Sequence, residues 1–148
     1  MLNNIVSYKE AFSNLHVKIV DERKFPNKAI LLISVMNLVR CGYITDNRIR
    51  LDNTIGVAFD YYWRMFINST SPIVWTPFWH MKNERFWHFQ PIYTLADIDE
   101  IVKPGETASL GKMKKVIKYA YLDNELFNII QEPYGRTELF TVLKQFLY

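Results

Sequence analysis

The chain has 148 residues, of which 49% are hydrophobic and 16% aromatic, and its formal net charge is +3. This length predicts one domain over residues 1–148 with ample material for a core, and no stretch is long and apolar enough to span a bilayer. The N-terminus shows no secretory signal, and the single Cys41 excludes an internal disulfide, so we expect a cytoplasmic protein with no membrane partner. The apolar neighbours of Cys41 predict a packed, unreactive thiol.

The first half of the chain predicts three helices. A short one covers Ile5 to Asn14. The next begins at Asn27, its expected N-cap, and its apolar residues cover most of its circumference until Gly42 ends it. Such all-round apolarity indicates a buried central helix. An aromatic-rich third helix runs from Leu51 or Asp52 to Phe66.

The segment from Thr76 to Phe89 concentrates aromatic, histidine and cationic residues, with Glu84 as its only acid. Alternation predicts a β-hairpin around the loop Asn83–Arg85. One face of this hairpin would be apolar, formed by Trp79, Met81, Trp87 and Phe89. Aromatic surface mixed with positive charge suits nucleic acid better than a small polar metabolite. A purely structural hairpin that closes over the core remains the alternative.

The last third of the chain predicts four more helices. They cover Thr94 to Ile101, Ser109 to Tyr119, Glu125 to Gln131, and Tyr134 or Gly135 to Leu147. Asp123 would cap the third of them, and Pro104-Gly105 would end the first. Taken together, the patterns predict a mainly α (α+β) protein, a single compact helical domain with a small β-hairpin.

Positive charge gathers in two places. Five lysines and one acid lie between Lys103 and Lys118, and Arg23, Lys24 and Lys28 form a second group. A basic surface for an anionic partner would explain both groups, and a solvated helix face explains each group alone equally well.

Catalytic and metal-binding patterns are poorly represented. His80 and His88 would face each other across the hairpin, but two histidines without a third ligand do not make a zinc site. Asp97 and Asp99 stand at an ordinary helix start, where acids favour the helix dipole. We therefore expect neither an enzyme nor a cofactor or metal.

Three stretches, taken in order, carry a family resemblance: Tyr8 to Leu38, Thr76 to His88 and Ala120 to Gln131. They resemble the sulfur-binding domain of McrA-like, phosphorothioate-dependent (type IV) restriction endonucleases. Relatives show His-Lys-Pro or His-Arg-Pro where this chain has Asn27-Lys28-Ala29, and an aromatic or aliphatic residue where it has Thr76 before the proline. Family members usually append an HNH nuclease domain, which this chain does not show, so it resembles a stand-alone reader.

The resemblance implies a non-catalytic protein that binds phosphorothioate-modified double-stranded DNA in bacterial defence. An apolar cup for the sulfur would form around Pro77, with Thr76, Phe78 and His80 beside it. The resemblance also carries a basic contact over to Lys28. The other expected DNA contacts are Asn27, Arg23, Ser109, Lys112, Lys114 and Lys115.

Two other functions stay open. In the first, the chain is a protein-interaction subunit whose aromatic hairpin docks a separate nuclease subunit. In the second, it is itself a cryptic nuclease, which ranks last because the metal-ligand set is missing.

Overall fold

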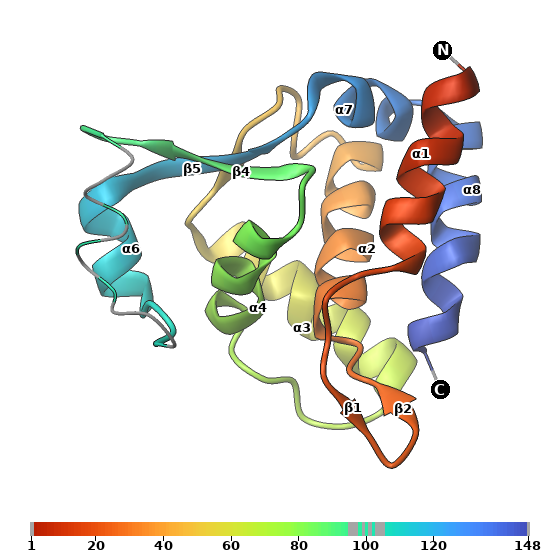
Figure 1. Ribbon diagram of the computed structural model, residues 1–148, viewed down its shortest axis with the longest axis horizontal. Coiled ribbons are helices and arrows are strands. Elements are labelled where there is room, and N and C mark those ends of the chain that lie inside the picture. The colour runs from red at the N-terminus through yellow and green to blue at the C-terminus, as the bar shows by residue number, and fades with distance from the viewer. Residues whose placement is uncertain (1, 95–97, 99, 101, 103–105, 148) are drawn as a thin grey trace.

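The computed structural model describes residues 2–94, 98, 100, 102 and 106–147. The fold is α+β and mainly helical, as predicted, with helices packed around one core and two small antiparallel sheets at its edges (Figure 1). The helices are α1 (Leu2–Ser13), α2 (Asn27–Arg40), α3 (Asn53–Ile67), α4 (Trp75–His80), α6 (Leu110–Val116), α7 (Asn124–Gln131) and α8 (Pro133–Leu143), with 3-10 turns η1 (Met81–Asn83) and η2 (Lys144–Phe146). The strands are β1 (Ile19–Val20), β2 (Arg23–Lys24), β3 (Ile49–Arg50), β4 (Trp87–Pro91) and β5 (Ile117–Leu122).

Helix α2 is the buried central helix that its sequence predicts. Its residues from Lys28 to Met36 are all buried, and α3, α4, α7 and α8 pack around it. Gly42 ends the helix with φ +83°, and the N–H groups of Gly42 and Tyr43 donate to Val39 O and Leu38 O, the pairing that satisfies the last carbonyls. One detail differs from the prediction: Pro26 holds the N-cap position, and Asn27 is the first helical residue.

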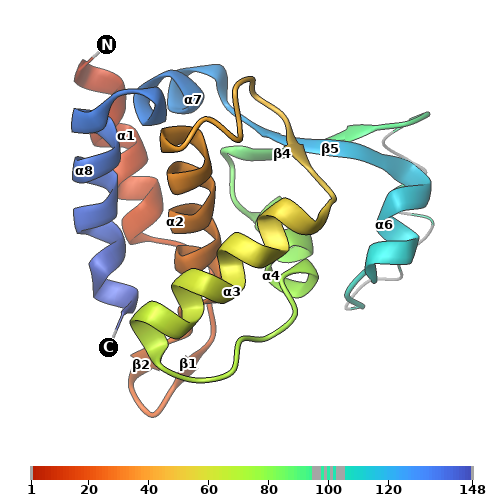
Figure 2. The same cartoon turned by 180° about the vertical axis from the view of Figure 1, so that it is seen from behind.

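Helix α3 confirms the predicted aromatic helix. Asp52 caps it by accepting a hydrogen bond from the Thr54 N–H at 3.0 Å. Asn68, with φ 60°, closes its C-terminal end. The helix packs against α2 and crosses the molecule on the side seen in Figure 2.

The predicted β-hairpin is wrong in its first arm. Residues 75–80 form helix α4, in which Phe78 and Trp79 are buried, followed by a buried Met81 in η1. Burial at 78, 79 and 81 follows a helical period and not the alternation of a strand. Pro77 fits because the first turn of a helix tolerates a missing N–H.

The second arm is a strand, as predicted, but its partner is distant in sequence. β4 pairs with β5, placing Trp87 opposite Leu122 and Phe89 opposite Ala120. β5 also pairs with β3, so it is the central strand of the three. The predicted basic helix therefore ends at Val116, where the β-branched and aromatic residues of β5 begin.

Helices α7 and α8 close the core at the C-terminal end. Pro133 starts α8 at its first turn. Gly135 allows the two helices to meet, because a Cβ there would lie 2.0 Å from Ile129 O. Cys41 is exposed, so the predicted packed thiol is wrong.

Several predictions fall outside the described residues: the carboxylates Asp97 and Asp99, Lys103, and the Pro104-Gly105 helix end. Among the residues that the structure does describe, no helix combines the length and the apolar character needed to cross a bilayer.

Candidate nucleic-acid interface

A groove of about 540 Å³ lies between the start of α2, helix α4 and the loop after α1. It brings together residues that the sequence placed in one site from two separated segments: Asn27, Lys28, Thr76, Pro77 and His80. Residues that were not predicted complete its lining: His16, Val17, Lys18, Phe25, Asn83 and Thr107. The lining therefore mixes apolar, amide, hydroxyl and basic groups, and none of its described residues is Asp or Glu.

A buried ion pair stands beneath this groove. Lys28 Nζ donates to Glu84 Oε2 at 2.6 Å, and both residues are buried. Glu84 also accepts a hydrogen bond from the His16 N–H at 2.9 Å, and His16 Nδ1 lies 3.2 Å from its Oε1. The hydrogen bonds and the ion pair offset the cost of removing the Glu84 carboxylate from water. Because that carboxylate is paired with Lys28, the positive charge of Lys28 is largely neutralised where it meets the groove.

His80 forms another wall of the groove. Its Nε2 lies 2.8 Å from Thr107 Oγ1, which ties α4 to the segment before α6. Burial, followed by the charges of Lys28, Lys82 and Lys18, lowers the pKa of His80. The imidazole is therefore held in its neutral form over a wider pH range than a free histidine.

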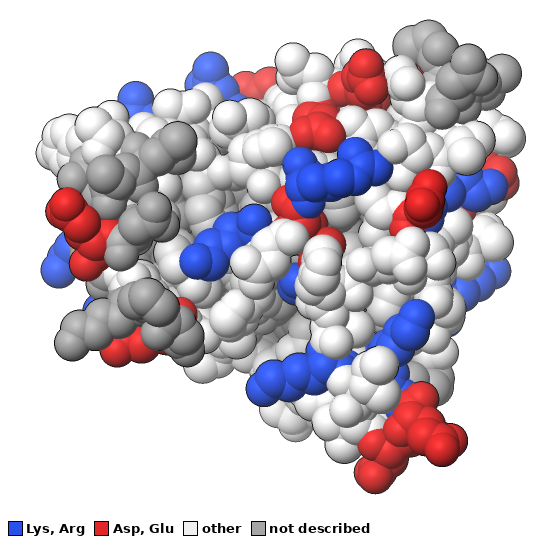
Figure 3. All heavy atoms as spheres, in the orientation of Figure 1, with Lys and Arg blue, Asp and Glu red and all other residues white. Residues whose placement is uncertain are grey.

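Two lysines lie near His80 at this groove. Lys18 lines the groove and is exposed, and Lys82 places its Nζ 4.4 Å from the centre of the Trp79 ring. Figure 3 shows Lys and Arg side chains scattered over this face among uncharged residues, with acidic side chains between some of them. The face is consequently mildly basic and not a continuous positive surface.

The aromatic residues of the Thr76–Phe89 segment are in the core and not at the surface. Phe78 has no exposed surface and packs against Trp75, Trp87 and Phe89. Phe78 is therefore wrong as a wall of the groove; it supports α4 from beneath. For the same reason an aromatic docking patch on this segment is wrong, because Trp79, Phe86 and Trp87 are buried as well.

The remaining predicted contacts lie apart from the groove. Arg23 belongs to β2 and lines a hollow of the small hairpin. Ser109 caps α6 by accepting a hydrogen bond from the Lys112 N–H at 3.3 Å. Lys112 lies 4.0 Å from Glu106, whereas Lys114 and Lys115 are exposed on α6. Thr107, which borders both regions, connects this basic helix to the groove.

The two histidines of the predicted hairpin do not face each other. His88 Nε2 instead lies 2.6 Å from Asp123 Oδ1, and the Tyr8 hydroxyl donates to Asp123 Oδ2 at 2.7 Å. Burial and the bond to Asp123 raise the pKa of Tyr8. This cluster ties α1, β4 and the start of α7 together. The described residues contain no group of three His, Cys, Asp or Glu side chains placed to hold a metal ion.

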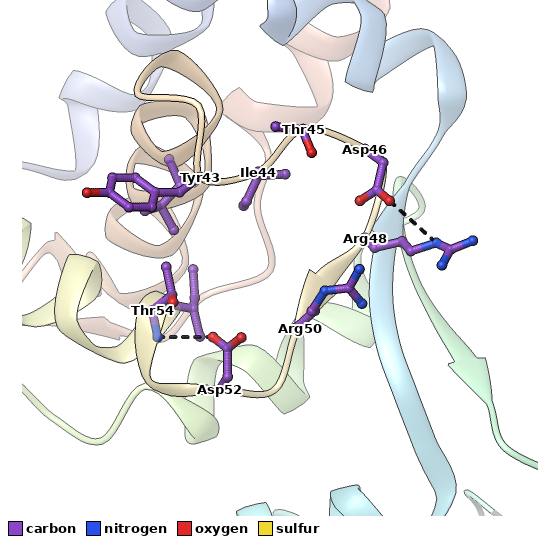
Figure 4. A pocket seen from close by; sticks show the side chains of 10 residues that line it. Tyr43, Ile44, Thr45, Asp46, Arg48, Arg50, Asp52 and Thr54 are labelled. Carbon is purple, nitrogen blue, oxygen red and sulfur yellow. Dashed lines mark hydrogen bonds and ion pairs between the residues drawn. The ribbon is translucent and has the colours of Figure 1, made fainter.

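A smaller pocket of about 160 Å³ lies beside β3 (Figure 4). It holds two arginines, Arg48 and Arg50, but also Asp46 and Asp52. Arg48 lies 3.8 Å from Asp46, and Asp52 caps α3, so three of the four charged residues named here already have intramolecular roles. This pocket is a weaker candidate than the groove.

The sequence contained partial signals for the residues that it missed. Glu84 is the single acid of a basic and aromatic segment, and His16 and Lys18 lie within the first stretch of the family resemblance. Thr107 carries no such signal, because only the tertiary fold brings it to α4. A comparison with known protein families finds no model that matches this sequence, and a search of curated proteins finds no match either.

Proposed function

We propose that this chain is a non-catalytic, cytoplasmic reader that binds phosphorothioate-modified double-stranded DNA in the groove between α2 and α4. The observation that carries the proposal is the meeting of Lys28, Pro77 and His80 in one concavity. These residues come from segments about fifty positions apart, and the family resemblance links both segments to sulfur recognition.

The chemistry of the groove suits sulfur better than oxygen. A phosphorothioate replaces one non-bridging phosphate oxygen with sulfur, which is larger, more polarisable and more weakly hydrated. Val17, Phe25 and the small part of the largely buried Pro77 that reaches the groove offer apolar contact, and their side chains form no hydrogen bonds with water. An ordinary phosphate oxygen on such a surface would lose its water without replacement, which costs on the order of 1–3 kcal/mol.

The charges around the groove fit the same ligand. The buried Lys28 is neutralised by Glu84, and the pKa of His80 is lowered, so the inner surface has low charge density. Lys18 and Lys82 near His80 supply attraction for the flanking phosphates. The exposed lysines of α6 extend this attraction along a duplex, and phosphate contacts of this kind fix position without reading sequence.

The test is a titration of one short duplex, with and without a single phosphorothioate, in metal-free buffer at physiological salt. We expect the modified duplex to bind at least tenfold more tightly, about 1.4 kcal/mol. Both stereoisomers and several core sequences are titrated in parallel.

Equal affinity for modified and unmodified duplexes across all cores and both stereoisomers would refute the proposal. Metal-dependent cleavage of either duplex by stringently purified protein would refute its non-catalytic part.

A further inference from the structure

The side of the molecule formed by α3 carries a stripe of exposed apolar residues. Val57, Tyr61 and Met65 are spaced four residues apart, and they are 70%, 57% and 52% exposed. That spacing places the three side chains in one row along the helix. Tyr43, 74% exposed, stands beside the start of this row. A contiguous row of large exposed apolar side chains on a folded domain is a candidate interaction site.

Two grooves border the stripe and run into each other. One has a volume of about 410 Å³ and the other about 470 Å³, and Asn37 and Tyr62 line both. The first reaches α8 through Phe140, and the second reaches the loop after α2 through Tyr43. The result is one concave, largely apolar strip along α3, which we call the α3 groove.

The charged residues that the structure describes in the lining of the α3 groove are both positive. They are Arg40 and Arg136, and none of the described lining residues is Asp or Glu. Arg40 donates to Asn37 Oδ1 at 3.2 Å, and Arg136 donates to the carbonyls of Ile130 and Gln131 at 2.9 Å. Neutral acceptors hold both guanidinium groups, so their charge is available to a partner's carboxylates.

We propose that the α3 groove docks an amphipathic helix of a partner protein, with acidic residues beside its apolar face. The 15 residues of α3 span about 22 Å, which matches a helix of roughly four turns laid alongside it. Tyr, Met and Arg are enriched at such interfaces, and each is present here.

A second copy of this chain is the less suitable occupant. A two-fold contact through the α3 groove would bring the arginines of both copies onto one surface, where no described lining residue is acidic. Like charges facing each other in an interface oppose association. An acidic partner removes that repulsion.

The inference does not depend on DNA binding. Within the part of the chain that the structure describes, the α3 groove and the groove between α2 and α4 have no lining residue in common. Helix α3 lies behind α4 in Figure 1 and in front in Figure 2, so one molecule has room for both ligands.

The test is a display selection on the full chain, using a library of amphipathic helices of about 18 residues. The flanking positions of the library vary freely among Glu, Lys, Gln and Ser. We expect the enriched peptides to carry an excess of Glu and to bind in a fluorescence titration. Val57→Asp and Arg40→Glu should each weaken that binding at least tenfold. Val6→Asp, an equally exposed valine on α1, is the matched control and should leave it unchanged.

Three results would overturn the proposal. The first is no enrichment above a selection without protein. The second is enrichment without an acidic excess, or binding that Val57→Asp leaves intact. The third is a dimer in sedimentation that Val57→Asp dissociates, which would make a second copy the occupant.

Discussion

Lysine residues stand in two opposite environments on this molecule. Lys28 is buried beneath the groove with Glu84 2.6 Å away, whereas Lys114 and Lys115 on α6 are exposed. From the sequence, all three lysines were predicted to contact DNA. The structure separates them: Lys28 shapes and supports the groove, and the α6 lysines provide charge that salt can screen. We therefore expect substitution of Lys28 to change the free energy of unfolding, and substitution of the α6 lysines to change the salt dependence of DNA binding.

The largest effect is expected from Lys28→Met. The change leaves Glu84 buried without its cation, so we expect the free energy of unfolding to fall by about 3–5 kcal/mol. Urea denaturation measures it.

The double variant Lys28→Met/Glu84→Leu is the control. It removes both charges, so it should recover most of the stability that the single variant loses. If Lys28→Met were as stable as the parent, the buried ion pair would not stabilise the contact between α2 and the end of η1.

Thr76→Trp tests whether the groove is responsible for the preference for phosphorothioate-modified DNA. Thr76 is exposed on α4, so a larger side chain fills the groove without entering the core. We expect the preference for the modified duplex to fall by about tenfold, or ~1.4 kcal/mol. The duplex titration measures this, with Thr141→Trp on the exposed side of α8 as the matched control. A preference that survives Thr76→Trp would place the sulfur elsewhere.

The double variant Lys114→Ala/Lys115→Ala tests the exposed lysines of α6. Each lost phosphate contact should reduce the slope of log affinity against log salt by about 0.9, with stability changed by less than about 0.5 kcal/mol. Titrations at several salt concentrations measure the slope. An unchanged slope would exclude α6 from the DNA contact.

The smallest effect concerns His80. The pKa of His80 is lowered in the folded state. As the pH falls through the ordinary histidine pKa of about 6.5, the unfolded chain therefore binds the proton before the folded protein does. Stability should therefore decrease with falling pH in that range, and His80→Gln should reduce the decrease. Urea denaturation at neutral and mildly acidic pH tests this, and an identical pH dependence in both proteins would contradict it.

The helices of the core could be predicted because their signals are local. The apolar circumference of α2, Gly42 after it and the Asp52 cap of α3 all act within a few residues. The pairing of β4 with β5 could not be predicted this way, since Trp87 meets Leu122 across a long stretch of sequence. Alternation around Trp79 and Met81 then pointed to a strand, while core packing favoured the helix.

The groove was predictable in part. The family resemblance related Lys28 to Pro77, and the fold does bring the two together. Spacing alone could not show that Lys28 is buried against Glu84, or that Phe78 points into the core. Burial decides what a charged or aromatic side chain does, and burial is a property of the tertiary fold.

The central claim concerns where DNA binds, and amide chemical-shift mapping tests it most directly. Isotope-labelled protein is titrated with the modified duplex and, separately, with the unmodified one. The account predicts that the difference between the two titrations is concentrated at His16 to Lys18, Asn27 and Lys28, and Thr76 to Asn83, with α6 shifting alike in both. Differences confined to α6 or to the pocket beside β3, with the groove unperturbed, would contradict it.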